Sequence, residues 1–344
     1  LLTIHSNTEG SATYTAMMFV PQRAPYDFYT KDFEKGLSLY ASGVLIMDKC
    51  ADLLPDHFAF VRGLVDSQDL SLNISREMLQ HDRQLKLISS SLEKKIKSEL
   101  LKLLKNDREK YEKLFESFGL QLKAGCHNDY GTHKEMLQDL LLFYSSTEKK
   151  MVTLAEYMDR MKEDQKEIYY ACGRTVEQIN LLPQMELFQE KGYEVLYLTH
   201  EIDEFAIKVM RDYKEKPYKS IADGSIDLEN AEDKEAAAKK AEEHKDLLDF
   251  CVNALNGSVK EIKLSTRLKS HPVCISADGP LSLEMERVLQ SMPNGHTMPK
   301  LDRILEINAN HPVFQTLCDL YTADTEKAAD LANILYNQAL LIEG

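Results

Sequence analysis

The sequence predicts an α+β fold that is spread over more than one domain, and three observations indicate it. Short β-rich runs lie near the start of the chain, at 11–20 and 37–47. A long amphipathic helix follows them, and from about 125 to 215 predicted helices alternate with short apolar strands, which is typical of a layered α/β structure. The 344 residues allow two or three domains, each large enough to bury a core.

The first 70 residues predict two strands and one short helix. The run "SATYTAMMFV" (11–20) is rich in β-formers and stops before Pro21, which is typical of a strand. The run "LSLYASGVLIM" (37–47) predicts a second strand, and a charged loop with two prolines joins the two. The run "DHFAFVRGLVDS" (56–67) predicts a short helix that ends in a turn.

Two helices are predicted next. The first begins near Asn73, runs to about Lys105 without Gly or Pro, and carries one apolar stripe of residues four apart. These stripe residues are Ile88, Leu92, Ile96 and Leu100. The run 107–122 predicts a second helix that folds back on the first, with Gly119 as its stop.

The segment from 125 to 215 predicts a small α/β layer. Thr153 with Glu156 and Thr175 with Gln178 have the spacing of capping boxes, so each pair marks the start of a helix. The β-rich runs 167–172 and 193–199 are short and continuously apolar, as strands buried in a parallel sheet are.

The charged segment 213–230, with proline and glycine turns, predicts a domain boundary. Helices are predicted over 231–255, 281–292 and 323–344. Between them, the run 262–268 alternates apolar with polar residues, which predicts a half-buried strand. The polar positions of that strand are Lys263, Ser265 and Arg267.

Composition excludes several classes of function. A net charge of −14 argues against a nucleic-acid partner and against an anionic membrane surface. The six cysteines are far apart and form no C-x-x-C pair, which indicates reduced thiols in a cytoplasmic protein. No histidines have metal-ligand spacing, so no metal site is expected, and no Walker-type or G-x-S-x-G motif is present. The start at Leu1 leads us to expect a fragment of a longer protein.

Arg76 is the principal candidate for chemistry. It follows the cap residues Asn73 and Ser75, so a guanidinium and helix N–H groups are expected together, a combination suited to phosphate or carboxylate. The alternative is a local ion pair with Glu77, Asp66 or Asp69. A second candidate is a hydrolase site in the loop 125–133, built from Cys126, His127 and Asp129.

Two helices carry apolar faces whose use the sequence leaves open. The first face lies on the helix predicted at 281–292. It either packs on adjacent strands or stays exposed to bind unfolded chains, and the second alternative is favoured by methionine, which adapts to many partners. Its residues are Leu281, Met285, Val288 and Leu289. The final helix either closes its own domain or pairs with a second copy. The residues on which we base that second possibility are Leu331, Leu335 and Ile342.

The run "VRGLVDSQDLSLNISREMLQ" (61–80) resembles the signature of the middle domain of the 90-kDa heat-shock chaperone family, most of all its bacterial HtpG branch. The runs "MMFVPQRAPYDFY", "YEVLYLTHEIDEF", "STRLKSHPVCISAD" and "LEINANHP" extend the resemblance over essentially the whole chain. The resemblance implies a layered α/β/α middle domain followed by a smaller α+β C-terminal domain. The middle domain would comprise a large subdomain with a helical connector (1–120) and a small α/β/α subdomain (121–230), and the dimerisation domain would be 231–344.

The resemblance also implies the function. The family's ATP-binding domain is not found in this sequence, so the fragment alone should bind neither ATP nor Mg²⁺, whereas the full-length protein should be an ATP-dependent chaperone. By matched position, Arg76 would contact the γ-phosphate on that ATPase domain, with Asn73 and Gln80 beside it. Phe205 and the 281–292 face would contact unfolded clients. Full-length chains would form homodimers, although the family's last dimerising helix is not found. The alternative is a nucleotide-independent scaffold that only binds proteins.

Overall fold

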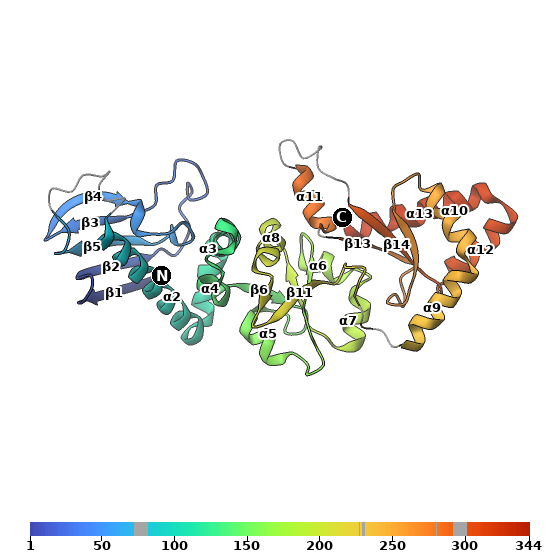
Figure 1. The fold of residues 1–344 in the computed structure, drawn as a ribbon, viewed down its shortest axis with the longest axis horizontal. Coiled ribbons are helices and arrows are strands. Elements are labelled where there is room, and N and C mark those ends of the chain that lie inside the picture. The colour runs from blue at the N-terminus through green and yellow to red at the C-terminus, as the bar shows by residue number, and fades with distance from the viewer. Residues whose placement is uncertain (72–81, 227, 229–230, 280, 292–300) are drawn as a thin grey trace. The chain divides into compact units, whose positions relative to one another are not determined.

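The computed structural model describes residues 1–71, 82–226, 228, 231–279, 281–291 and 301–344. The chain forms two compact units, Leu1–Leu142 with Thr153–Glu156 and Phe143–Val152 with Tyr157–Gly344. Figure 1 shows helices and sheets in both units, so the predicted α+β class is confirmed. The domain boundaries that the sequence suggests near residues 120 and 230 stay predictions.

A five-stranded sheet forms the centre of the first unit, in the order β1-β2-β5-β3-β4. Its strands are β1 (Leu2–Thr8), β2 (Tyr14–Val20), β3 (Leu37–Ala41), β4 (Val44–Cys50) and β5 (Arg62–Ser67). The strand β5 pairs antiparallel with β2 and parallel with β3, so it is an inner strand. Alternate side chains of β2 are buried, as the pleat requires, which confirms the strand predicted at 11–20.

Two segments of this sheet differ from the prediction. The run 37–47 is a hairpin rather than one strand, because Ser42 and Gly43 have positive φ angles of 50° and 78°, which a tight two-residue turn requires. The run 56–67 is not a helix but the 3-10 turn η2 (Asp56–Phe58) followed by β5. Gly63 favours the strand: its φ is 140°, and a Cβ there would lie 2.1 Å from the Met17 carbonyl oxygen of β2.

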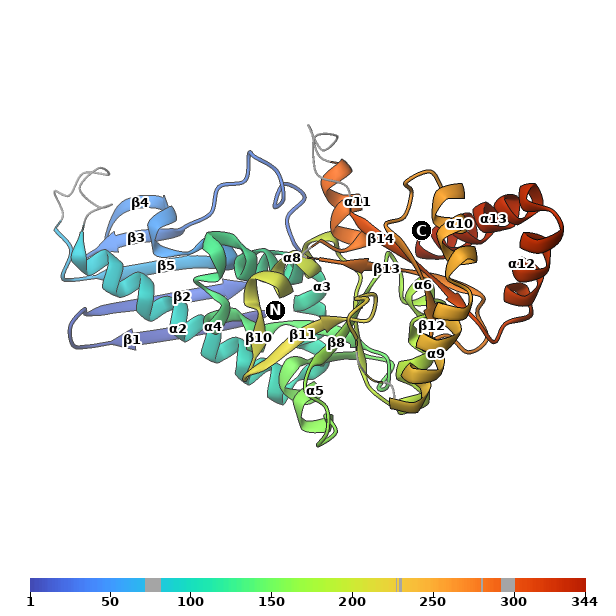
Figure 2. The same cartoon turned by 45° about the vertical axis from the view of Figure 1, so that its right-hand side comes forward.

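Two long helices complete the first unit, α2 (Arg83–Asn106) and α3 (Arg108–His127). The predicted stripe of α2 is buried, and the Tyr14 hydroxyl of β2 donates to Ser91 Oγ of α2 at 2.7 Å. Figure 2 shows α2 running along the sheet. Gly119 does not end α3, because the Phe115 ring covers it and a Cβ would lie 2.7 Å from that ring. Glycine therefore serves packing inside the helix. Shorter elements follow: η1 (Ala51–Leu53), η3 (Asn128–Gly131), α4 (Lys134–Leu137) and η4 (Gln138–Leu140).

A second sheet has six strands in the order β10-β11-β8-β9-β6-β7. They are β6 (Leu142–Ser145), β7 (Met151–Thr153), β8 (Ile168–Cys172), β9 (Val195–Leu198), β10 (Asp212–Tyr213) and β11 (Lys216–Ser220). Parallel pairing of β8 with β9 and β11 confirms the buried strands predicted at 167–172 and 193–199. The strand β11 lies inside the segment predicted as a linker. The accompanying helices are α5 (Leu154–Arg160), α6 (Val176–Asn180), α7 (Met185–Lys191) and α8 (Glu201–Met210).

The first predicted capping box is confirmed and the second is confirmed in part. The Thr153 N–H donates to Glu156 Oε2 at 2.7 Å, and the Glu156 N–H donates to Thr153 Oγ1 at 3.1 Å. The Gln178 N–H donates to Thr175 Oγ1 at 3.2 Å, but Gln178 Oε1 accepts from the Arg174 N–H. The return bond is therefore shifted by one residue in the second case.

A third sheet, β12-β14-β13, belongs to the second unit and comprises β12 (Glu261–Ser265), β13 (Val273–Asp278) and β14 (Asp302–Asn308). Its helices are α9 (Ala231–Glu243), α10 (Lys245–Ala254), α11 (Leu283–Ser291), α12 (Pro312–Ala323) and α13 (Thr325–Glu343). The single helix predicted over 231–255 is interrupted at His244. Residues of β12, β13, β14, α10, α12 and α13 form one apolar core.

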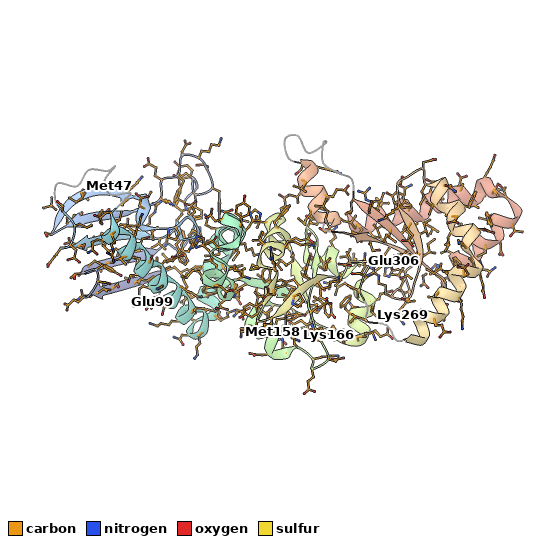
Figure 3. The ribbon with its side chains drawn as sticks, viewed as in Figure 1. Met47, Glu99, Met158, Lys166, Lys269 and Glu306 are labelled. Atoms are coloured by element: carbon orange, nitrogen blue, oxygen red, sulfur yellow. The ribbon has the colours of Figure 1, made fainter. Side chains whose placement is uncertain are left out.

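A buried ion pair lies at the end of β12. The prediction placed Arg267 on the polar side of a strand, but β12 stops at Ser265 and Arg267 is 4% exposed. Its Nε donates to Glu306 Oε2 of β14 at 2.8 Å, and its Nη2 donates to Oε1 of the same carboxylate. Its Nη1 donates to the carbonyls of Ile221 and Asp223, at 3.1 and 3.2 Å. Figure 3 labels Glu306 within this part of the fold.

Candidate functional site

The segment 72–81 carries the principal candidate, Arg76, and the structure describes the residues on either side of it. Asn73, Arg76 and Gln80 lie outside the described residues, so their predicted roles stay predictions. The segment 72–81 follows β5, the inner strand of the first sheet, and precedes α2. Residues on both sides of the segment form hydrogen bonds within the first unit.

The N-terminal end of the loop is tied to the start of β2. The Thr13 N–H donates to Asp69 Oδ2 at 2.6 Å, and the buried Ser67 hydroxyl donates to the Thr13 carbonyl at 2.7 Å. The Asp69 N–H donates back to Ser67 Oγ at 3.2 Å. Asp66, a second possible partner of Arg76, accepts from the Gly43 N–H at 3.1 Å. Both carboxylates thus have a structural use that does not involve Arg76.

The C-terminal end of the loop is a helix cap. Asp82 is the N-cap of α2 and its Oδ1 accepts from the Leu85 N–H at 2.9 Å. The long helix α2 therefore begins at Arg83, ten residues after the start predicted near Asn73. The first turn holds no acidic residue, and Arg83 is exposed there. The positive end of the helix dipole and a cation thus lie at the loop's end, which is an arrangement that attracts anions.

The predicted client-binding residues lie on the helices α8 and α11, which pack on one another, except Leu281, which precedes α11. Phe205, Leu281, Met285 and Leu289 are partly exposed. Val288 is 6% exposed, so exposure of the whole face is wrong at that residue. Glu286 of the same helix is buried as well, and its carboxylate accepts from the Leu301 N–H at 3.1 Å and from Arg303 Nη2 at 2.6 Å.

Polar residues hold α11 beside α8. The Ser282 hydroxyl donates to Glu204 Oε2 of α8, and the Tyr170 hydroxyl donates to Glu204 Oε1 at 3.0 Å. A cavity of about 190 Å³ lies here, lined among others by Glu204, Glu284 and Arg287. Burial raises the pKa of Glu284, while the Arg287 Nη2 donates to it at 2.5 Å. The Ser282 hydroxyl thus holds the start of α11 beside α8, and the Glu284–Arg287 ion pair lies within α11.

The residues predicted for a dimer contact lie largely inside their own chain. Leu335 is 2% exposed in the core of the third sheet, so its predicted contact role is wrong. Leu331 packs against the same core and Ile342 against the core of the six-stranded sheet. The same helix, α13, exposes Ile334 and Leu341, at 60% and 82%. Nothing in the sequence pattern separates the exposed Ile334 from its buried neighbour Leu335.

The loop proposed as a hydrolase site lacks a usable nucleophile. Cys126 is buried, and burial raises the pKa of its thiol to about 12, so the thiolate is not formed near neutral pH. Asp129 adopts a left-handed φ of 51° in η3 with its side chain largely in solvent. These observations contradict the hydrolase alternative.

A cluster of possible metal ligands was missed by the sequence. His57, Glu93 and His133 bring their ligand atoms within 4.8 Å of one another. The prediction of no metal site relied on short motifs, and these residues are separated by 36 and 40 positions, so spacing carries no signal. In the part of the chain that the structure describes, no helix combines the length and apolarity needed to cross a bilayer.

Comparison with known proteins gives a consistent result. A family model described as Hsp90 protein matches residues 1–344. A protein named Chaperone protein HtpG, from Clostridium acetobutylicum, is 59% identical over 344 residues, which are 100% of this chain and 55% of the relative. Proteins of the same name from Bacillus subtilis and Alkaliphilus metalliredigens are each 56% identical over 341 residues, 99% of this chain and 54% of each relative. The chain spans about half the length of the curated relatives it matches.

Proposed function

Because the chain belongs to the Hsp90 protein family, we propose that it forms the middle and C-terminal domains of an ATP-dependent molecular chaperone that acts in the cytoplasm. The match over residues 1–344 is the observation that carries the proposal. In this proposal the five-stranded sheet belongs to the large subdomain of the middle domain, and the six-stranded sheet belongs to its small subdomain. The third sheet and its helices form the C-terminal domain.

Arg76 acts on the nucleotide in this proposal. A guanidinium offered from one domain to the γ-phosphate held by another neutralises the charge that develops during phosphoryl transfer. Two observations support it: the loop has both ends tied to the first unit, and its C-terminal end is the positive end of α2 with Arg83 in the first turn. ATP and Mg²⁺ would be held by the ATPase domain, because this chain has no phosphate-binding glycine loop.

The test is Arg76→Ala in the full-length protein. Loss of an arginine of this kind lowers turnover by about 10³-fold or more, whereas ATP affinity should stay near that of the unaltered protein. Arg83→Ala is the matched control, since it removes an exposed arginine from the same stem and should leave turnover within a factor of about three. Unchanged turnover in Arg76→Ala would overturn the assignment. Equal loss in both variants would show that general positive charge, not Arg76, is responsible.

We place client binding at the partly exposed apolar residues of α8 and α11. Phe205, Met285 and Leu289 are partly exposed there, whereas Val288 is buried. Met285→Glu with Leu289→Glu should weaken binding of a partly folded model protein by at least about 10-fold, since a buried apolar contact becomes an unpaired charge. Leu181→Glu, at an apolar residue that is 69% exposed elsewhere in the second unit, is the control and should bind normally.

Dimerisation is assigned to the exposed side of α13. Ile334 and Leu341 are seven residues apart, so they lie on one face of the helix. Sedimentation velocity of the full-length protein should show dissociation when both become Asp, and no change for Asn333→Asp, which adds the same charge about 100° around the helix from Ile334. A dimer that survives the double change would reject this surface.

The alternative, a scaffold that binds proteins without nucleotide, predicts a different result in a mixing experiment. If this chain is mixed with a separately prepared ATPase domain of the family, the proposal expects a rise in ATP turnover that depends on Arg76. No rise, together with normal client binding, would favour a scaffold without a nucleotide cycle.

A further inference from the structure

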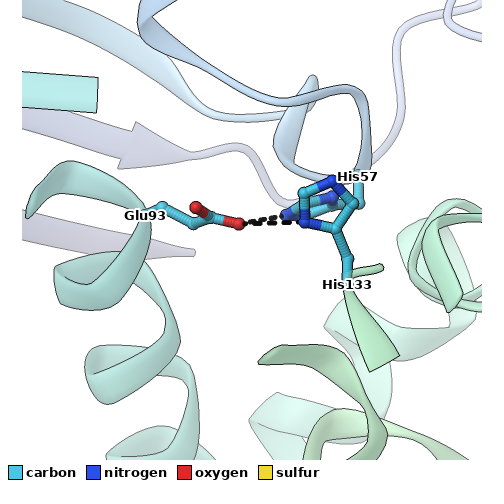
Figure 4. A group of neighbouring side chains, drawn as sticks. All are labelled: His57, Glu93 and His133. Carbon is cyan, nitrogen blue, oxygen red and sulfur yellow. Dashed lines mark hydrogen bonds and ion pairs between the residues drawn. The ribbon is translucent and has the colours of Figure 1, made fainter. Parts of the chain in front are cut away.

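Three side chains from distant parts of the first unit meet at one point. Figure 4 shows His57 and His133 directed toward the carboxylate of Glu93. His57 belongs to η2, Glu93 lies on α2, and His133 directly precedes α4. The elements that carry them are separately anchored, so the meeting does not arise from neighbours along the chain.

Their ligand atoms have the spacing of a coordination site. His57 Nε2 lies 3.0 Å and His133 Nδ1 3.7 Å from the same oxygen, Glu93 Oε1, and all three atoms lie within 4.8 Å of one another. Ligands bound at about 2.0–2.1 Å in a tetrahedral site are about 3.3–3.4 Å apart, so small side-chain adjustments would bring the three to one ion. The 3.7 Å separation is too long for a hydrogen bond, so His133 gains little from the carboxylate by itself.

The cluster is also preorganised and accessible. His57 is 2% exposed, and a Cβ at Gly125 would lie 2.5 Å from the His57 Cβ, so α3 packs closely against this histidine. The side chains of Glu93 and His133 are 18% and 31% exposed, which leaves a path for a hydrated ion.

We propose that His57, Glu93 and His133 bind a divalent transition-metal ion, with Zn²⁺ the best match. Two imidazoles and one carboxylate are a ligand set that Zn²⁺ accepts, and a fourth position would be left for water. The competing explanation is a cluster without an ion, in which Glu93 pairs with both histidines and the His57 and His133 rings pack against each other with centroids 4.8 Å apart. Asp129 Oδ2 lies 3.9 Å from His133 Nε2, the nitrogen that faces away from Glu93.

Such an ion would cross-link residues 57, 93 and 133. It would connect the turn before β5, the helix α2 and the start of α4 by bonds that do not depend on the hydrophobic core. Because it binds the folded arrangement and not the unfolded chain, it should raise the melting temperature of the first unit in proportion to the logarithm of its concentration.

The test uses the 344-residue chain, free of any histidine tag, with Zn²⁺ in calorimetry and Co²⁺ as a spectroscopic probe. We expect one saturable site per chain and visible Co²⁺ bands of four- or five-coordinate N/O ligation. Glu93→Gln and His133→Ala should each weaken binding by more than about 100-fold, because even outer partners are worth 10–100-fold. Glu93→Gln keeps the shape and hydrogen-bonding capacity of the side chain, so it tests ligation without removing the packing.

The controls separate this site from other histidines and from thiols. His5→Ala removes an exposed histidine of the same unit and should bind Zn²⁺ normally. Cys126→Ser should do the same, and no sulfur-to-cobalt charge-transfer band should appear. Unaltered affinity in both ligand variants, absence of a saturable site, or a thiolate band would overturn the proposal. A zinc-dependent rise in melting temperature that is lost in His133→Ala but kept in His5→Ala would confirm the cross-link.

Discussion

Replacing Arg267 by Met should unfold the third sheet at a much lower denaturant concentration. The change removes both hydrogen bonds to Glu306 and the two that Nη1 donates to the Ile221 and Asp223 carbonyls. It keeps an apolar chain of similar length. The principal cost comes from Glu306, which stays buried with its charge uncompensated.

The magnitude follows from that burial. Removing one partner of a buried ion pair costs about 3–5 kcal/mol, because the remaining charge is neither solvated nor paired. The two carbonyls add to this unless water reaches them. The hydroxyls of Ser265 and Ser276 still donate to Glu306, at 2.9 and 2.7 Å, and limit the loss. We therefore expect a decrease of about 3–5 kcal/mol in the free energy of opening of this sheet.

A second ion pair serves as the control. It joins the residue before β12 to the first residue of β14. Lys260 Nζ lies 2.8 Å from Asp302 Oδ2, with the two side chains 52% and 55% exposed. An exposed pair of this kind is worth about 0–1 kcal/mol, so Lys260→Met should cost less than about 1 kcal/mol. Hydrogen exchange of β13 and β14 amides in increasing urea measures both variants. Equal losses in the two variants would refute the reasoning.

The pH dependence gives an independent check. Burial would raise the pKa of Glu306, but the Arg267 guanidinium and the two serine hydroxyls outweigh it and hold the pKa below its usual range. That stability is present above the carboxyl's unfolded pKa and is lost as pH falls through the folded pKa. Without Arg267, burial raises the pKa instead, and the folded variant gains stability from protonation as pH falls. The difference between variant and unaltered protein should therefore shrink between pH 7 and pH 5, whereas Lys260→Met should show no such change.

Three further predictions concern the other elements. Thr153→Ala removes the acceptor of the Glu156 N–H and should cost about 1 kcal/mol in local opening of α5, by hydrogen exchange; no change would contradict the capping role. Gly63→Ala should cost more than about 2 kcal/mol in urea melts, whereas Gly10→Ala, at a similar φ but in open space, should cost less than half as much. Cys126, with its pKa raised to about 12, should react with iodoacetamide about 10³-fold more slowly than in the unfolded chain, and equal rates would disprove its burial.

Much of the fold was predictable because local patterns decide it. The stripe of α2 and the strands β2, β8 and β9 follow from periodicities that reflect which side chains meet the core. The errors have a common cause. The run that contains Gly63 was predicted as a helix and Gly119 as a helix end, yet each glycine is needed because another group approaches closely in three dimensions. A single sequence does not contain that information.

The candidate sites were less predictable than the fold. Arg76 was singled out by its place after the cap residues Asn73 and Ser75, but its γ-phosphate partner was assigned only because a stretch of sequence resembles a known family. The ion pair of Arg267 with Glu306 and the cluster around Glu93 join residues 36 to 40 positions apart, and nothing in their local sequence marks them. Burial also reversed two expectations, at Val288 and Leu335, because an apolar stripe shows that a face is covered but not by what.

The 72–81 segment has a limited reach because the residues on both sides of it are held in the first unit. Asp69 is bonded to Thr13, and Asp82 begins α2, so both are part of the rigid body of the first unit. An extended chain advances at most about 3.3–3.6 Å per residue, which limits the Cα of Arg76, six residues from Asp82, to a sphere of about 20–22 Å around it. Any phosphate that Arg76 meets must therefore come within one arginine side-chain length of that sphere, whatever path the segment takes.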